Sequence, residues 1–320
     1  MKAIRVHQFG DPEVMAMEEI PAPAPGAGQV LIQIEAAGVN PVDTYIRAGS
    51  YARRPELPFT PGIDGAGTVA AVGSGVTSIE IGARVYGGWP DSGTYAAMAL
   101  YPAEQVYPLP PQISFQQGAG IFVPYSTAHR ALFAKALAQP GETVLVHGAT
   151  GSVGLAATQI AVAAGMRVLG TGGTPEGRSL VAQQGASQVF DHHSPDYPAE
   201  VLAATAGRGA DVILEMLANV NLEKDLALVA PHGRIVIIGS RGSLEINPRA
   251  IMGKESIVTG LTLFNTHPEA LAHIQAALQT GLQNGTLIPI VSREFSLAEA
   301  SQAHQWLLQP GAQGNLVLIP

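Results

Sequence analysis

A glycine-rich turn is the part of this sequence best suited to bind a charged ligand. Residues 144–162 read VLVHGATGSVGLAATQIAV, a β-branched run and a turn followed by a helical apolar pattern from Val153. Within it, Ala149, Gly151 and Gly154 stand on the G-x-G-x-x-G frame of a dinucleotide-binding turn. In such a turn the backbone approaches a pyrophosphate at the N-terminus of a helix, where the dipole favours negative charge. The spacing predicts a dinucleotide site.

The end of the next predicted strand indicates which dinucleotide binds. Sites that prefer NAD carry Asp or Glu there, to hydrogen-bond the ribose 2′-hydroxyl. Here the tip is Thr171–Thr174, without an acid, and Arg178 follows a few residues later. Arg178 could hold a 2′-phosphate through charge-assisted hydrogen bonds, so we expect NADPH. The alternative is that Arg178 is a solvated helix residue and that Glu176 recruits the ribose hydroxyls of NAD.

A second polar cluster lies in the stretch AGVNPVDTYIRAGSY. Asn40, Asp43, Tyr45 and Arg47 are close enough in sequence to project into one cleft from a loop and a helical turn. Asn40 before Pro41 is also a good helix N-cap, with proline at the first helical position. Capping explains Asn40 but leaves Tyr45 and Arg47 free, so we assign Tyr45 to a substrate pocket.

The composition excludes several kinds of chemistry. The chain has no cysteine, which removes disulfides, thiol nucleophiles and thiolate zinc ligands. His192 and His193 are adjacent, a spacing that does not converge easily on one metal ion, and we expect His147 to be a packed, hydrogen-bonded residue. No P-loop lysine and no G-x-S-x-G elbow occurs. We therefore expect no bound metal and neither kinase nor hydrolase activity.

The elements that must position these residues change character along the chain. Residues 1–115 read as short strands between turns, whereas helical patterns alternate with short apolar strands after Gln116. Six such strands separated by helices predict a doubly wound parallel sheet. We predict them at 143–147, 166–170, 187–190, 210–215, 234–239 and 256–261.

The end of the chain predicts how the domains are connected. Helical patterns at Pro268–Thr280 and Ser296–Leu308 precede an apolar strand, Asn315–Ile319, which we expect to return to the N-terminal β domain. The predicted α/β architecture is a Rossmann doubly wound sheet inserted in a mostly β catalytic domain. Residues 1–117 and 263–320 would form the catalytic domain and residues 118–262 the nucleotide-binding domain.

Charge and hydropathy limit the partners. The net charge of −8 argues against broad nucleic-acid binding, since ArgArg at 53–54 is the only adjacent basic pair. No apolar run approaches the roughly 18 residues of a membrane helix, and the N-terminus lacks the apolar core of a signal peptide. We therefore expect a cytoplasmic protein with a small-molecule substrate and no membrane partner.

These features carry a resemblance to a known family. The chain resembles the zinc-free medium-chain dehydrogenases/reductases, and specifically the ζ-crystallin type of NADPH:quinone oxidoreductase, whose β domain is GroES-like. The later matching stretches, with EMLANVNL, IGSRG and EINPR, are the most specific. The resemblance runs through AAGVNPVDTYIRAGSY, LPFTPGIDGAGTVAAVG, VPYSTAHRAL, VLVHGATGSVGLAATQIA, GTGGTPEGR, ILEMLANVNLEKDLALVAPHGRIVIIGSRGSLEINPR and KESIVTGLTLF.

The resemblance implies a set of site residues. Tyr45, Asn40 and Thr127 would form the catalytic set, with Tyr45 beside the nicotinamide and substrate and Thr127 on the carboxamide side. The remaining cofactor residues would follow the pyrophosphate turn, the adenosine ribose and phosphate, the adenine and the later strand ends. In that order they are Thr150, Gly151, Ser152 and Val153, then Gly173 and Arg178, then His192, then Asn221, Ile238, Gly239, Ser240, Arg241, Leu261, Thr262 and Leu263.

The implied activity is reduction of small ortho-quinones by NADPH without metal or flavin. Two alternatives stay open: an NADPH-dependent enone or alkenal reductase, and an NADPH-binding or RNA-binding protein with little turnover. The segment SIVTGLTLF reads as an edge strand with an apolar end, which suits pairing with its copy. We expect at least a homodimer, with a tetramer as a further option.

Overall fold

The computed structural model describes residues 1–320, which form two compact units. The first unit comprises Met1–Val123 and Gln279–Pro320, and the second comprises Pro124–Leu278. By compactness, residues 263–278 belong to the second unit, whereas the sequence had assigned them to the catalytic domain. The functional domain boundaries at 117 and 262 stay a prediction.

The first unit is built on a mostly antiparallel sheet in which the long strand β3 is central. β3 pairs with β4, β6 and β15. A separate two-stranded sheet joins β1 (Lys2–Val6) to β2 (Met15–Glu19). The strands of the larger sheet are β3 (Gln29–Val39), β4 (Gly65–Val72), β5 (Arg84–Gly87), β6 (Met98–Pro102), β7 (Val106–Pro108), β14 (Val291–Ser296) and β15 (Asn315–Ile319).

The last strand returns to the N-terminal sheet, as the sequence predicted. β15 pairs antiparallel with β3, with Leu316 opposite Val39, and parallel with β14. The sequence analysis missed β14, because its sequence VSREFS is mostly exposed and lacks an apolar alternation. It is an edge strand, and pairing with β15 rather than local pattern holds it in the sheet.

Helices of the first unit close its hydrophobic core. They are α1 (Pro41–Arg47), α2 (Phe115–Gly118) and α10 (Ala300–Leu307), and α9 (Pro268–Asn284) crosses the boundary between the units. The core includes fully buried aromatic residues, Tyr95 and Tyr101 among them. No helix in the structure is both long enough and apolar enough to span a membrane.

The second unit is the predicted doubly wound sheet. Six parallel strands lie in the order β10-β9-β8-β11-β12-β13, which is the dinucleotide-binding order 3-2-1-4-5-6 when numbered within the unit. Its strands are β8 (Thr143–Val146), β9 (Arg167–Gly172), β10 (Gln188–Asp191), β11 (Ala210–Glu215), β12 (Val229–Ile237) and β13 (Ile257–Gly260). The six predicted strands are confirmed, with small shifts at their ends.

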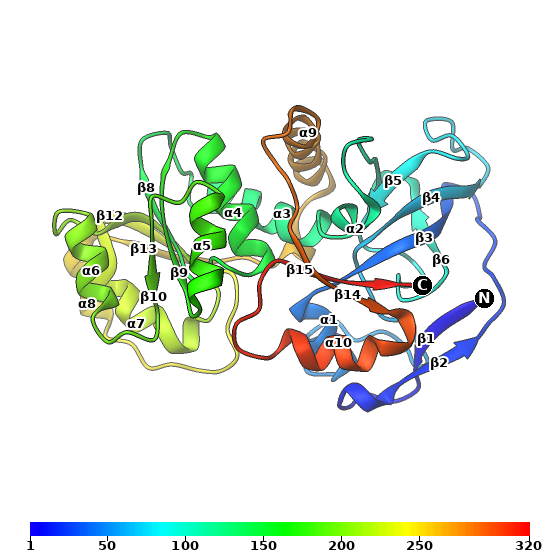
Figure 1. The fold of residues 1–320 in the computed structure, drawn as a ribbon, viewed down its shortest axis with the longest axis horizontal. Coiled ribbons are helices and arrows are strands. Elements are labelled where there is room, and N and C mark those ends of the chain that lie inside the picture. The colour runs from blue at the N-terminus through cyan, green and yellow to red at the C-terminus, as the bar shows by residue number, and fades with distance from the viewer. The chain divides into compact units, whose positions relative to one another are not determined.

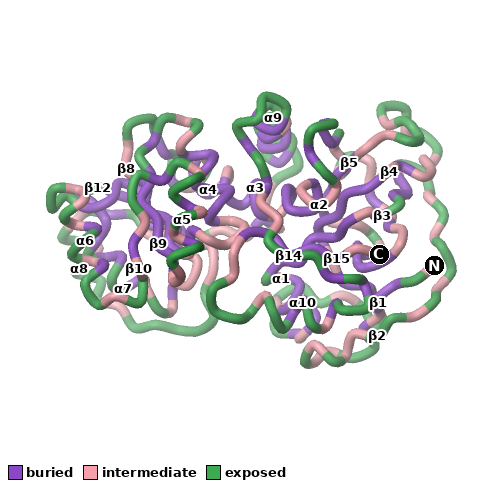
Figure 2. The backbone as a smooth tube through the Cα atoms, in the orientation of Figure 1, coloured by how far each residue is buried: buried purple, intermediate pink, exposed green.

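Helices cover this sheet and explain why its central strands are uniformly apolar. Every residue of β11 is buried, and Figure 2 shows β8 and β9 similarly buried, while α8 has no buried residue. Strands covered on both faces read as continuous hydrophobic runs. The helices are α3 (Phe122–His129, which continues as a π-helix over Arg130–Lys135), α4 (Ser152–Ala163), α5 (Pro175–Gln183), α6 (Tyr197–Ala204), α7 (Ala218–Leu228) and α8 (Pro248–Lys254) (Figure 1).

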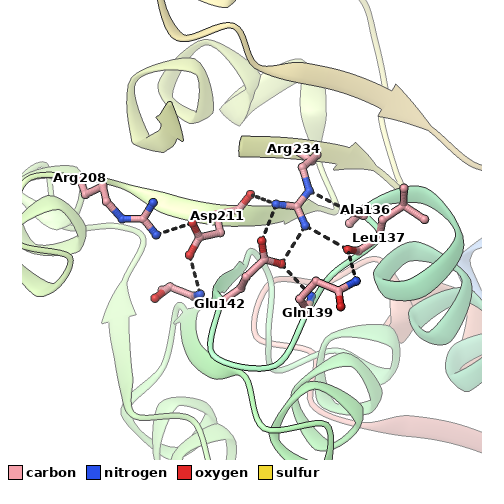
Figure 3. A network of polar contacts seen from close by, with 8 residues as sticks. Ala136, Leu137, Gln139, Glu142, Arg208, Asp211 and Arg234 are labelled. Carbon is pink, nitrogen blue, oxygen red and sulfur yellow. Dashed lines mark hydrogen bonds and ion pairs between the residues drawn. The ribbon is translucent and has the colours of Figure 1, made fainter. Parts of the chain in front are cut away.

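A polar network fixes the amino-terminal end of the sheet (Figure 3). Arg234 of β12 donates from Nη1 and Nη2 to the two carboxylate oxygens of Glu142, each at 2.8 Å. Asp211 accepts from the backbone N–H of Thr143 at 2.8 Å and also pairs with Arg208. Because β8, β11 and β12 are held together at this end, their opposite, carboxyl ends are free to carry loops.

Candidate active site

The glycine turn joins β8 to α4 at the carboxyl edge of the parallel sheet. Gly148 has φ +55°, and the backbone N–H of Gly151 donates to its carbonyl oxygen at 3.1 Å. The turn is tied to the end of β9, since Ala149 N–H donates to the Thr171 carbonyl at 2.9 Å. Gly151 caps α4 without a side chain. The first N–H groups of a helix have no intrahelical acceptor, so they suit a phosphate.

Each glycine of the turn has a different steric role. A Cβ added to Gly154 would lie 2.5 Å from the carbonyl oxygen of Gly148 and 2.6 Å from Ala149 Cα. These are backbone atoms that cannot move aside, so Gly154 is required for the close approach of α4 to the turn. A Cβ on Gly151 would meet only the Gly148 oxygen, at 3.6 Å. Gly151 is therefore not needed for internal packing, which leaves its open side for a ligand.

The end of β9 has the uncharged tip that the sequence indicated, but a carboxylate reaches it from the next strand. Arg178 of α5 donates from Nη1 to the Gly172 carbonyl at 3.2 Å, and the same atom lies 2.9 Å from Oδ2 of Asp191. Asp191 is the last residue of β10. Asp191 was not predicted, because it lies on the third strand of the parallel sheet and not at the tip of the second. The available signal was an acid directly before the pair His192–His193.

His192 lies beside Gly173 at the ends of β9 and β10. A Cβ on Gly173 would come within 2.8 Å of the Nε2 atoms of both His192 and His193. Burial lowers the pKa of His192, and neighbouring His193 lowers it further. The His192 imidazole is therefore disposed to be neutral beside Gly173.

The loops after β11 and β12 are joined by backbone and amide hydrogen bonds. The N–H groups of Ile238 and Gly239 donate to the Glu215 carbonyl oxygen at 2.8 and 3.2 Å. Asn221 of α7 donates to the Glu215 carboxylate at 3.2 Å. Asn219, which the sequence analysis missed, accepts from Arg241 N–H at 2.8 Å. Asn219 and Glu215 thus hold the 238–241 loop against the start of α7.

The segment after β13 is held by a residue of the π-helix. Arg130 donates to the carbonyl oxygens of Thr262 and Asn265 at 2.5 and 3.3 Å. Leu261 N–H donates to the Ile237 carbonyl at 3.1 Å. Thr127, one turn before Arg130, is 6% exposed. Arg130 was not predicted. The available signal was its position three residues after Thr127, a predicted site residue, in a helical segment.

In the first unit, the structure corrects the prediction of one polar cleft at 40–47. Asn40, Asp43 and Arg47 are each less than 5% exposed and face the interior, whereas Tyr45 is partly exposed. Asn40 does cap α1: its N–H donates to Asp43 Oδ2 at 2.8 Å. Its side-chain amide donates to Asp64 Oδ2 at 3.1 Å. Residues 40, 43 and 47 are three and four positions apart and so share one face of the helix, whereas residue 45 lies on another face, because successive helical residues are about 100° apart.

The buried carboxyl groups below Tyr45 hold their protons more tightly than usual. Burial raises the pKa of Asp43 to about 7, partly opposed by the hydrogen bonds from Asn40 and Tyr95. Burial also raises the pKa of Asp64 well above its ordinary value, although Asp64 accepts from Val123 N–H at 3.1 Å. Tyr95 contacts His304, with 3.0 Å between the hydroxyl and Nε2. Tyr45 therefore stands on a helix anchored by a buried polar network.

Comparison with known proteins fits both units. Residues 26–111 match the family model of the alcohol dehydrogenase GroES-like domain, and residues 152–278 match that of the zinc-binding dehydrogenases. Human quinone oxidoreductase is 47% identical over 321 residues, covering 100% of this chain and 98% of that protein. The Lama guanicoe quinone oxidoreductase is 49% identical, covering 100% and 97%.

The chain belongs to the quinone oxidoreductase family. It is of the ζ-crystallin-like kind, within the medium-chain dehydrogenases/reductases, so the family resemblance and the GroES-like and Rossmann folds are confirmed. A solved structure of Escherichia coli quinone oxidoreductase complexed with NADPH superposes with a TM-score of 0.91 at 30% identity, covering 100% of both chains.

The donor groups of this quinone oxidoreductase family member do not fit the zinc implied by the second family model. The chain has no cysteine. The Asn40 side-chain amide donates a hydrogen bond to the Asp64 carboxylate. A donating amide N–H is not a metal ligand, so this pair does not supply a zinc site. His147, Glu215 and Asp225 do cluster, but His147 Nε2 lies 2.8 Å from Asp225 Oδ1. Two ligands about 2.0–2.2 Å from one tetrahedral zinc are farther apart than that.

Proposed function

We propose that this protein reduces quinones with NADPH. The observation that carries the proposal is the carboxyl edge of the parallel sheet, where the glycine turn, an uncharged β9 tip and Arg178 occur together. The chain has 47% identity with human quinone oxidoreductase along its whole length, which supports quinones as the substrate class. Ligands bind outside the carboxyl ends of the strands in doubly wound sheets.

The residues of the second unit fit NADPH. The turn residues Thr150–Val153 would bind the pyrophosphate, and Gly173, Arg178 and His192 would bind the 2′-phosphorylated adenosine. Arg178 supplies a planar cation for the phosphate, although Asp191 shares that cation. The nicotinamide half would lie along the later strand ends, at Asn221, the 238–241 loop and the 261–263 segment, with Thr127 on the carboxamide side. NADPH supplies the reducing electrons when bound.

Tyr45, Asn40 and Thr127 would serve the substrate end. Tyr45 is the partly exposed member of the α1 cluster, and its hydroxyl would donate a hydrogen bond to a quinone oxygen. Asn40 acts through α1, since its backbone and amide hydrogen bonds fix the start of that helix. The protein contributes orientation and exclusion of water, and a quinone is electrophilic enough to need no metal to polarise it.

We also propose that the protein forms a homodimer through β13. This strand is the edge of the six-stranded sheet, and Ile257 at its start is 56% exposed. Met252 on the neighbouring α8 is 71% exposed. An exposed apolar edge strand is a template for pairing with a second copy.

Turnover before and after treatment with a strong chelator tests the metal-free quinone reductase. We expect NADPH oxidation by benzoquinone to be unchanged after chelation, and NADH to be a poorer donor. Replacement of Tyr45 by Phe should lower kcat about tenfold, the worth of one hydrogen bond, while NADPH still binds. Loss of activity that zinc restores would contradict the proposal.

A further inference from the structure

Three ionisable side chains are enclosed beneath the predicted cofactor loops of the second unit. His147 follows β8, Glu215 ends β11 and Asp225 lies on α7; they are 2%, 0% and 0% exposed. His147 Nε2 lies 2.8 Å from Asp225 Oδ1 and 3.8 Å from Glu215 Oε2. We call these residues the buried triad. Its charges are costly in a low-dielectric core unless they neutralise one another.

Glu215 connects the buried triad to the loops predicted to bind NADPH. Its Oε1 accepts hydrogen bonds from the backbone N–H of Leu217 and from the Asn221 amide, the latter at 3.2 Å. Its carbonyl oxygen accepts from the N–H groups of Ile238 and Gly239. His147 directly precedes Gly148 of the glycine turn. The Glu215 carboxyl group thus fixes the start of α7, and the backbone carbonyl of the same residue holds the loop after β12.

The other oxygen of Glu215 indicates where a proton resides. Glu215 Oε2 is buried without a hydrogen-bond donor, and so is Asp225 Oδ2, so that a proton fits between the two carboxyl groups. A proton on Oε2 would be donated toward Asp225 and would leave Oε1 free to accept from Leu217 and Asn221. With His147 protonated, a single proton between the two carboxyl groups makes the net charge of the triad zero.

The surroundings agree with this distribution of protons. Burial raises the pKa of Glu215 to about 7, opposed by His147 and reinforced by Asp225. Burial lowers the pKa of His147, but Asp225 and Glu215 outweigh it and raise the pKa above its ordinary value. The other ionisable groups facing the triad are Tyr197 of α6, Lys224 of α7 and, after β10, His192.

We propose that Glu215 is a positioning residue for NADPH, and that the proton it shares with the buried triad sets the affinity for this cofactor. The proposal rests on the proposed function of the same site. Loss of the Glu215 proton would leave a net negative charge in the core beside Asp225. That charge would push the two carboxylates apart, displace Asn221 and, through the Glu215 backbone, the 238–239 loop, and repel the cofactor phosphates.

Two substitutions at one position separate the proton from the hydrogen bonds. E215Q keeps an acceptor at Oε1 and a donor in place of the protonated Oε2, but it cannot ionise. E215A removes both. L222A destabilises the same helix through its core without touching the triad, and E223Q changes an exposed acid on that helix.

The measurement is NADPH affinity, by fluorescence titration, from about pH 6 to about pH 9. We expect the NADPH affinity of the wild type to fall about tenfold over this pH range. The affinity of E215Q should change much less with pH than that of the wild type, and E215A should bind NADPH weakly at every pH. L222A and E223Q should keep the wild-type slope. Ionisation of the NADPH phosphate affects all variants alike.

The outcomes separate this inference from the proposed function. Tight NADPH binding by the wild type, with the same pH slope in E215Q, would overturn the role of the Glu215 proton and leave the proposed function standing. Equal affinity in E215A and wild type would overturn the positioning role. Absence of NADPH binding in the wild type would overturn both proposals. A stoichiometric metal ion that is lost in E215A would also contradict the proton assignment.

Discussion

Arg178 and Asp191 form an ion pair across the ends of two parallel strands, with 2.9 Å between Nη1 and Oδ2. The guanidinium also donates to the Gly172 carbonyl, so it is held at the β9 tip. Asp191 has a lowered pKa, first because His193 N–H donates to it and also because of Arg178. The carboxylate therefore orients the cation and at the same time reduces the local positive charge.

Replacement of Arg178 by Gln should weaken NADPH binding much more than NADH binding. The lost charge-assisted contact is worth about 1.5–3 kcal/mol, or about tenfold to a hundredfold in affinity. Titration of each dinucleotide against wild type and variant measures this. Equal losses for the two dinucleotides would show that Arg178 does not contact the 2′-phosphate.

Replacement of Asp191 by Asn should have the opposite effect. The amide keeps an acceptor for His193 N–H and removes the negative charge beside the expected 2′-phosphate. We expect the preference for NADPH over NADH to rise about threefold, in line with a partly exposed charge interaction. The double variant with R178Q is the control, since it should show no such gain. A lower preference for NADPH in D191N would mean that orientation of Arg178 outweighs the charge.

Two glycines of one turn should respond differently to alanine. G154A places Cβ against the Gly148 and Ala149 backbone, so it should lower the free energy of unfolding by about 1–3 kcal/mol. G151A meets no close atom and should change it by no more than about 0.5 kcal/mol, while weakening NADPH binding. Urea unfolding and NADPH titration of both variants measure this. Wild-type NADPH affinity in G151A would refute its place at the pyrophosphate.

Asp43 should make the protein less stable as pH rises toward neutrality. Its pKa is raised from 3.8 to about 7 in the folded state, so the folded protein keeps a proton that the unfolded chain loses between these values. Stability from this group is full below the unfolded value and is lost as pH rises through about 7, at most about 4 kcal/mol. D43N should remove this part of the slope, measured by urea unfolding at several pH values.

The matched control for D43N is E56Q, which changes an exposed acid in the same unit. It should leave the slope as in wild type. A residual slope in D43N is expected, because Asp64 also has a raised pKa and contributes with the same sign. An unchanged slope in D43N would mean that Asp43 is ionised in the folded protein at neutral pH.

Sequence reasoning succeeded where the signal is local. The glycine turn, the six apolar strands and the returning strand Asn315–Ile319 follow from residue patterns within each segment, and the structure has them. It failed where a role depends on a neighbour distant in sequence. Asp191 meets Arg178 only because β10 pairs with β9. Arg47 is buried only because α1 packs against the rest of the first unit.

Glu215 shows that a local signal can also be overlooked. It is a lone charged residue inside the otherwise apolar run VILEML, and burial of such a residue requires partners. Those partners are His147, directly after β8, and Asp225 of α7, so their identity required the fold. The charged residue in an apolar run was visible in the sequence, but the residues that compensate its burial become neighbours only in the folded protein.

The most direct test of the proposed activity compares two acceptors with one donor. Steady-state NADPH consumption is measured with phenanthrenequinone and, separately, with a medium-chain 2-alkenal, at equal enzyme concentration. The account predicts rapid turnover of the quinone and little or none of the alkenal. Turnover of the alkenal alone would contradict it and would assign the site to reduction of an activated carbon–carbon double bond.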